Sequence, residues 1–369
     1  MGRCGRAAPS RRSSLGAFVL LLLVMLSLAA LIPTAQATKA KAKLVPKFYK
    51  SSCPRAEVII SSVVNTAFNR EAGNAPAILR MFFHDCFIHG CDASVLIDGP
   101  GSEKNATENE GLHGWEIIDD AKAAVEKQCP GVVSCADILA MAAQLSVKKL
   151  SAGRIKYKLR LGRRDGLVSS AADVPASIPK ETASVAELKS IFKANGLSTK
   201  DMVALSGAHS VGVAGCDKIQ DRLTATPPDA TLDATYAAVL KKQCPNATEL
   251  RHRCHWEWEC AEMANSELNL DLTTPNLLDE VYYKNLQANK GLLTSDQNLQ
   301  TDPQTRRMVA SNTKFRKFRQ VTELREGDGE DGQQRPPHGQ PGRDPCELPQ
   351  LQLGSEVFYE SSYVLFHIT

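Results

Sequence analysis

The sequence predicts an all-α fold, and three observations support that prediction. Most segments between Ala56 and about Leu293 carry apolar residues at helical spacing, and short turns containing Gly or Pro separate them. Strand-like alternation is scarce, and no internal repeat is present. A chain of 369 residues, 43% of them hydrophobic, is also long enough to bury a large core in one or two domains.

Start and stop signals define the expected helices. Ser134 and Ser184 are each followed three residues later by an acidic residue, the pattern of a helix N-terminal cap. Cys129-Pro130-Gly131 and Asn195-Gly196 are typical helix endings. The expected helical segments, in chain order, are Val58–Phe68, Ile117–Val125, Ile138–Leu145, Leu188–Phe192 and a segment from Ser198 to His209.

Residues 1–37 are a predicted signal peptide. An uncharged stretch runs from Leu15 to Ile32, and Ala35-Gln36-Ala37 follows it with the small residues of a cleavage site. The basic head before the stretch contains Arg3, Arg6, Arg11 and Arg12. The apolar stretch is long for a signal peptide, so an uncleaved membrane anchor is the alternative, but we favour cleavage after Ala37.

Secretion determines how the cysteines are interpreted. The chain has 11 cysteines, and all except Cys4 lie beyond the signal peptide, where an oxidising compartment favours disulfides. Asn105 and Asn246 begin triplets that accept glycans in the same compartment. The net charge of +3 is spread along the chain, so we expect no nucleic-acid partner, and no membrane contact after signal cleavage.

The run from Phe82 to Ser94 contains two histidines, two aspartates and two cysteines. A metal site, a disulfide loop and the floor of an active site all fit that composition. His84 follows Arg80 by four residues, so the two share one face of a helix. A neighbouring guanidinium favours the neutral imidazole that a general base needs, although a purely structural histidine is the alternative.

A second histidine, His209, lies in the stretch Leu205–Gly212 among small residues. Small side chains allow a large flat group to approach the backbone closely. A histidine buried in the core or capping a helix is the alternative interpretation.

Together these stretches resemble the secretory (class III) haem peroxidases of plants. Leu79–Phe87 is similar to the distal motif of that family, and Asp201–Gly212 is similar to its proximal motif. Three more stretches follow the family's order and approximate spacing: Val133–Ala140, Leu161–Gly166 and Gly291–Gln297. The resemblance implies a fold in which distal and proximal helical halves sandwich one haem b.

The resemblance also implies the roles of the site residues. His209 would bind the haem iron, and Asp296 would accept the other ring N–H of His209.

On the distal side, His84 would accept and return a peroxide proton, and Arg80 would stabilise the charge that develops as the O–O bond breaks. Asn109 would hold His84 in its basic tautomer, and Phe83 would shield the pocket. Pro175 would line the channel for the donor.

Two calcium ions are implied as well, because carboxylate, hydroxyl and carbonyl oxygens suit that cation. The distal calcium ligands would be Asp85, Ile88, Gly90, Asp92 and Ser94. The proximal calcium ligands would be Ser210, Asp271, Thr274, Leu277 and Asp279. The alternatives are a zinc site and, for 271–279, a turn with helix caps. That zinc site would use His84, Cys86, His89 and Cys91.

Three disulfides are implied by the resemblance: Cys53–Cys129, Cys86–Cys91 and Cys216–Cys244. Cys135 would pair with a cysteine near the C-terminus, but this chain has no reliable partner for it there.

Two segments depart from the family, one within and one after a predicted peroxidase domain of residues 38–318. Residues 251–264 form an insertion that contains Cys254, His255 and Cys260. We favour a surface insertion with a local disulfide, or a misassigned intron, over a metal site. Residues 319–369 lack the family's closing helix and are rich in Gly, Pro and charge, as disordered segments are. Codons for Gly327–Leu348 can encode the family's ending when read one nucleotide over, so we expect a frame-shifted tail.

The sequence therefore predicts a secreted haem peroxidase, located in the cell wall with the vacuole as an alternative. It would reduce hydrogen peroxide, oxidise small phenolic donors by one-electron steps, and act as a monomer. Two alternatives remain: a non-catalytic relative unable to retain haem, and a zinc hydrolase using the Cys/His-rich insertion.

Overall fold

The structure, a computed structural model, describes residues 44–245 and 266–318. All of them belong to one compact unit, Lys41–Thr369. A second unit, Met1–Ala40, contains the predicted signal peptide and lies outside the described residues, as do the predicted insertion and tail.

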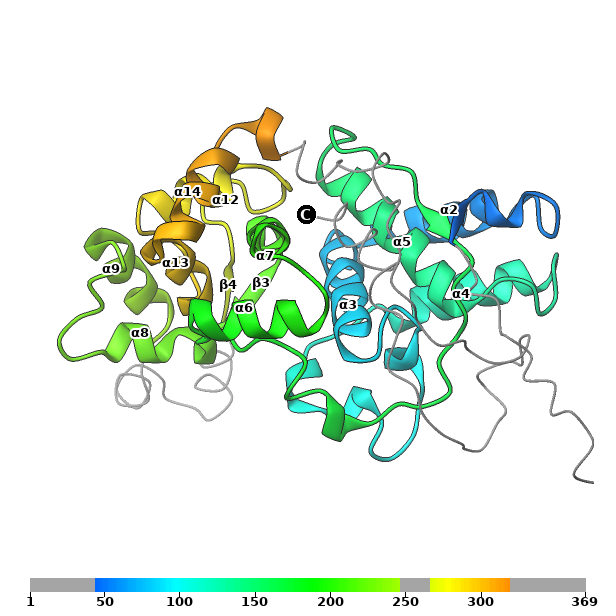
Figure 1. Cartoon of the computed structure of the whole chain (residues 1–369), viewed down its shortest axis with the longest axis horizontal. Helices are drawn as coiled ribbons and strands as arrows, with labels where there is room; N and C mark the ends of the chain where they lie inside the picture. The colour runs from blue at the N-terminus through cyan, green and yellow to red at the C-terminus, as the bar shows by residue number, and fades with distance from the viewer. Residues whose placement is uncertain (1–43, 246–265, 319–369) are drawn as a thin grey trace, which may run out of the picture. The chain divides into compact units, whose positions relative to one another are not determined.

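Helices dominate the described residues, as the sequence predicts, and they pack in two groups (Figure 1). The first group is α2 (Ala56–Arg70), α3 (Asn74–Ile88), α4 (Trp115–Glu126) and α5 (Cys135–Leu150). The second group is α6 (Val185–Ala194), α7 (Thr199–Ser206), α12 (Val281–Gln287), α13 (Thr294–Thr301) and α14 (Pro303–Asn312). Two further helices, α8 (Gln220–Thr224) and α9 (Ala234–Gln243), pack against each other.

Capping residues begin several helices where the sequence places them. Ser184 and Glu187 form a reciprocal capping box at α6, in which each side chain accepts a backbone N–H of the other residue. Ser198 does the same with the residue three positions later at α7. At α5, Ser134 accepts the N–H of Asp137, but the Asp137 carboxylate bonds elsewhere.

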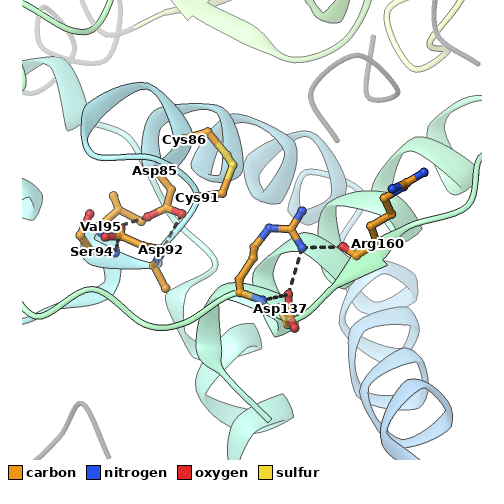
Figure 2. Close-up of a disulfide and its surroundings, with 10 residues drawn as sticks. Asp85, Cys86, Cys91, Asp92, Ser94, Val95, Asp137 and Arg160 are labelled. Atoms are coloured by element: carbon orange, nitrogen blue, oxygen red, sulfur yellow. Dashed lines mark hydrogen bonds and ion pairs between the residues drawn. A yellow bond between two sulfur atoms is a disulfide. The ribbon is translucent and has the colours of Figure 1, made fainter. Parts of the chain in front are cut away.

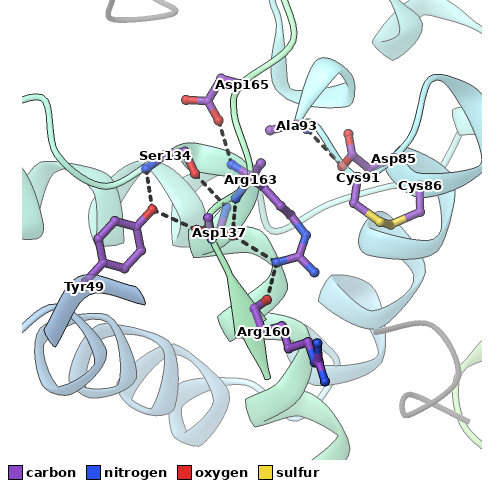
Figure 3. Close-up of polar contacts among 12 residues, drawn as sticks. Tyr49, Asp85, Cys86, Cys91, Ala93, Ser134, Asp137, Arg160, Arg163 and Asp165 are labelled. Atoms are coloured by element: carbon purple, nitrogen blue, oxygen red, sulfur yellow. Dashed lines mark hydrogen bonds and ion pairs between the residues drawn. A yellow bond between two sulfur atoms is a disulfide. The ribbon is translucent and has the colours of Figure 1, made fainter. Parts of the chain in front are cut away.

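The carboxylate of Asp137 instead joins three segments in the core (Figure 3). Arg163 Nη1 lies 2.9 Å from Asp137 Oδ1, and both side chains are fully buried. Gly162 N–H and the hydroxyl of Tyr49 donate to Asp137 Oδ2 at 2.6 and 2.8 Å. This network fixes the loop 162–166 against α5, since a buried ion pair that loses one partner is strongly destabilising.

Two short antiparallel sheets pin the loops. β1 (Val45–Pro46) pairs with β2 (Arg160–Leu161), and β3 (Val213–Gly215) pairs with β4 (Glu267–Asn269). In the second sheet Val213 lies opposite Asn269, and an isolated bridge joins Val211 to Asn276. The chain that follows His209 is therefore held beside residues 271–279.

Most of the core is one apolar cluster that includes residues from both helical groups, such as Ile78, Met81, Leu139 and Val203. A smaller cluster lies under α8, α9 and β4. Within residues 44–245 and 266–318, no helix is long and apolar enough to cross a membrane.

Candidate active site

The distal part of the site is built on α3. Nearly every residue of this helix is buried, which fixes its rotation and places His84 in the interior with 4% of its surface exposed. Arg80, one turn earlier on the helix, is exposed. Its guanidinium donates to the backbone oxygens of Glu108 and Glu110 at 3.1–3.2 Å, so α3 is tied to the segment that carries Asn109.

Asn109 fixes the tautomer of His84. It ends the 3₁₀ helix Thr107–Asn109, and its Oδ1 lies 2.6 Å from His84 Nδ1. The amide Nδ2 of Asn109 donates to the carbonyl oxygen of Glu103 at 2.8 Å, so Oδ1 must face the histidine. Because Oδ1 can only accept, His84 Nδ1 carries the proton, and Nε2 keeps its lone pair.

The surroundings of His84 also keep its ring neutral. Burial and the positive charge of Arg80 lower the pKa of His84 to about 3, while the hydrogen bond that His84 donates to Asn109 opposes them. Phe83 lies beside the ring, with the two ring centroids 5.7 Å apart in an edge arrangement. His84 is therefore a neutral, correctly oriented proton acceptor.

The proximal part of the site is centred on His209. The sequence places this residue late on a helix, but α7 ends at Ser206, and His209 lies in the 3₁₀ helix Gly207–Ser210. Its Nδ1 is 2.8 Å from Asp296 Oδ1, and Asp296 is held in the first turn of α13. This pairing leaves Nε2 of His209 to bind another group.

Asp296 determines the electrostatics of that histidine. Burial alone would lower the pKa of His209, but the charge and the hydrogen bond of Asp296 outweigh it and raise the pKa above its usual value. The same attraction for the Nδ1 proton makes the imidazole a stronger electron donor at Nε2. The arrangement fits the axial ligand of a haem iron.

Residues 85–95 form a candidate distal calcium site closed by a disulfide (Figure 2). The two oxygens of Asp85 accept from the N–H groups of Ala93 and Val95, at 3.0 and 3.3 Å. Ser94 Oγ is buried and has no hydrogen-bond partner in the described part of the chain. Burial, and for Asp85 also the charge of Asp92, raises the pKa of both aspartates. Such crowded buried oxygens fit a hard cation.

The zinc alternative for this run is wrong. Cys86 and Cys91 are joined in a disulfide and have no thiolate to offer a metal. His89 Nε2 pairs with Asp173 at 3.1 Å. Across residues 44–245 and 266–318, no three His, Cys, Asp or Glu side chains converge as a metal site by themselves.

A second cluster of oxygens follows β4. Ser210 Oγ donates to the carbonyl of Leu277 at 2.8 Å and accepts the N–H of Asp279 at 3.1 Å. Thr274 Oγ1 donates to Asp279 Oδ1 at 3.2 Å. Asp271 Oδ1 accepts three hydrogen bonds, two of them from the backbone N–H groups of Thr273 and Thr274, as in a capped turn. A capped turn does not explain Asp271 Oδ2, which is buried without a partner among the described residues.

The structure contains the three disulfides that the resemblance implies: Cys53–Cys129, Cys86–Cys91 and Cys216–Cys244. Cys135 begins α5, and residues 319–369, where the resemblance would place its partner, lie outside the described residues. Pro175 is exposed just after the 3₁₀ helix Ala171–Asp173.

Sequence reasoning did not single out two residues that the structure connects to the site. Glu103 anchors Asn109 through its backbone carbonyl, and both of its carboxylate oxygens are buried without partners in the described ranges. Tyr282, in the first turn of α12, donates its hydroxyl to Asp296. No local sequence pattern around Glu103 or Tyr282 predicts its contact with Asn109 or Asp296.

Comparisons with known proteins show the family of this chain. The family profile described as peroxidase matches residues 60–314. Peroxidase 55 of Arabidopsis thaliana is 43% identical over 272 residues, which cover 72% of this chain and 77% of the relative. Peroxidase N1 of Nicotiana tabacum is 43% identical over 71% of this chain and 76% of its own. For Peroxidase 22.3 of Oryza sativa subsp. japonica, the identity is 44% over 74% of this chain and 80% of the relative.

Proposed function

Because this chain belongs to the plant class III peroxidases and is a haem enzyme that reduces hydrogen peroxide, we propose that His84, Arg80 and His209 carry the reaction. The single observation that supports this assignment best is the pair of oriented histidines. His84 is turned by Asn109 so that Nε2 is basic, and His209 is turned by Asp296 so that Nε2 is a ligand.

On the distal side, His84 Nε2 accepts a proton from hydrogen peroxide and returns it to the departing oxygen. The low pKa of His84 ensures that the ring is neutral when peroxide arrives. Arg80 stabilises the negative charge that develops as the O–O bond breaks, because a fixed cation needs no rearrangement at that moment. Phe83 shields the pocket from water.

On the proximal side, His209 would hold haem b through Nε2, and the hydrogen bond from His209 Nδ1 to Asp296 would make Nε2 a stronger electron donor. Haem b held there would supply the redox chemistry, namely two electrons for the reduction of hydrogen peroxide, which two donor molecules would replace one at a time. The donors are small phenols that reach the site past Pro175. We further propose a secreted monomer of the cell wall.

Two calcium ions complete the proposal. The distal ion is held by Asp85, Ile88, Gly90, Asp92 and Ser94, and the proximal ion by Ser210, Asp271, Thr274, Leu277 and Asp279. The partnerless oxygens of Ser94 and Asp271 support these two sites, since a buried oxygen without a hydrogen bond is costly unless a cation takes its place.

The test is the visible absorption spectrum of the full chain, secreted and purified with haem and calcium supplied. We expect a Soret band that shifts when hydrogen peroxide is added. His209→Ala should lose the axial ligand and change the resting spectrum, whereas His84→Ala should keep the resting spectrum and slow the response to peroxide. A soluble chain with no Soret band would instead support the non-catalytic alternative.

A further inference from the structure

Tyr282 lies at the first turn of α12, which packs against the 3₁₀ helix that carries His209 and against α13. Only 2% of its surface is exposed. Its hydroxyl oxygen is 2.8 Å from Asp296 Oδ1. Because an ionised carboxylate only accepts hydrogen bonds, the tyrosine hydroxyl is the donor in this contact.

The same oxygen of Asp296 accepts the hydrogen bond from His209 Nδ1, also at 2.8 Å. Two donors therefore share one carboxylate oxygen. Each donor stabilises the negative charge on that oxygen and makes it a weaker acceptor for the other. The hydroxyl of Tyr282 thus limits how far Asp296 can pull the Nδ1 proton away from His209.

The hydroxyl is in place at every working pH, since burial and the charge of Asp296 raise the pKa of Tyr282 well above its ordinary value. The neighbouring Tyr283 provides a contrast. It is equally buried, but its hydroxyl donates to the backbone oxygens of Val203 and Ala204, at 2.9 and 3.3 Å. One tyrosine satisfies backbone groups, and the other acts on the partner of His209.

We propose that Tyr282 is a positioning residue that tunes the proximal ligand, because its hydrogen bond to Asp296 limits the imidazolate character of His209. This inference rests on the proposed roles of His209 and Asp296. The hydrogen bond of Tyr282 should therefore make His209 a weaker electron donor to the iron. A weaker donor stabilises ferric iron less, so the ferric/ferrous equilibrium should lie further toward ferrous iron than it would without Tyr282.

The experiment compares Tyr282→Phe with Tyr283→Phe in the haem- and calcium-loaded full chain. Each variant removes one buried hydroxyl and keeps the ring. The measurements are the ferric/ferrous midpoint potential and the iron–histidine stretching band of the ferrous protein.

For Tyr282→Phe we expect the ferrous-to-ferric ratio at a fixed potential to fall by about threefold to tenfold, where tenfold corresponds to about 59 mV for one electron. The stretching band should move to higher frequency. For Tyr283→Phe neither quantity should move, even where both variants lower the melting temperature equally. Equal or absent shifts in the two variants would reduce Tyr282 to a structural role.

A second substitution tests the inference even if Tyr282→Phe fails to fold. A fluorinated tyrosine at position 282 keeps the shape but is a stronger hydrogen-bond donor, so it should raise the ferrous-to-ferric ratio. A fall or no change would overturn the inference. If the parent chain lacks the iron–histidine band, the proposed role of His209 is wrong, and the inference about Tyr282 is then wrong as well. A parent band without a Tyr282 effect refutes the inference alone.

Discussion

Burial and the positive charge of Arg80 lower the pKa of His84 to about 3, so the imidazole is neutral in all but strongly acidic solution. A general base acts only in its neutral form, and that form is lost as the pH falls through the pKa. We therefore expect the rate constant for hydrogen peroxide to be level from about pH 7 to about pH 4 and to fall below about pH 3. Stopped-flow mixing over this range measures it.

The substitution His84→Ala should lower that rate constant by about 10²–10⁴ and abolish the acidic inflection. His113→Ala is the matched control, because His113 is exposed and should leave both the rate and the inflection unchanged. If the inflection survives in His84→Ala, it belongs to another group. An inflection near pH 6 in the parent protein would contradict the argument from burial.

The individual residues also show where sequence reasoning stops. Arg80, His84 and His209 lie in stretches that resemble the motifs of the family, and that resemblance predicts their roles. Glu103 contributes a backbone carbonyl, which any residue type could supply. Tyr282 acts through a hydroxyl 14 residues away from Asp296 in the sequence. Contacts of this kind depend on tertiary packing, and no spacing rule reveals them.

Among the elements, the loop 162–166 is packed tightly against the candidate distal calcium loop. Gly166 N–H donates to the backbone oxygen of Asp92 at 2.7 Å, and a Cβ atom on Gly166 would overlap the carboxylate of Asp92. Gly166→Ala should therefore displace a proposed calcium ligand. We expect weaker binding of calcium by about 1–3 kcal/mol, the usual cost of overpacking, measured by titration calorimetry on chelated protein.

Gly73→Ala is the control for that measurement. Gly73 has φ −66°, and within the described residues the only atom that a Cβ added there would meet is at 4.0 Å, so alanine fits without strain. Calcium affinity should be unchanged in this variant. If Gly166→Ala also keeps the parent affinity, Asp92 is not held by the loop in the way that the packing implies.

Element boundaries were predictable where side chains cap the backbone locally, as at Ser184 and Ser198. They were less predictable where tertiary packing decides. The helix expected to include His209 ends at Ser206, and the tighter 3₁₀ turn that follows presents His209 to Asp296. β3 and β4 are three residues each, too short to show alternation in the sequence.

For the whole molecule, stability should depend on calcium. Asp85 and Asp271 are buried, and in both proposed sites an oxygen lacks a hydrogen bond within the described ranges. A cation bound only by the native state stabilises it by about 2.7 kcal/mol when its concentration is a hundred times Kd. Chelation should therefore lower Tm by roughly 5–10 °C for each site at that saturation, measured by calorimetry with and without added calcium.

The distal contribution can be separated from the proximal one through Ser94. Its Oγ has no hydrogen-bond partner among the described residues, so Ser94→Ala should change the free energy of unfolding of the chelated protein by no more than about 0.5 kcal/mol. With calcium present the variant lacks one ligand oxygen, and its Tm gain from calcium should be smaller. Magnesium should not restore the difference, because it requires smaller octahedral sites. If calcium raises the Tm of the parent and of Ser94→Ala equally, Ser94 is not a calcium ligand.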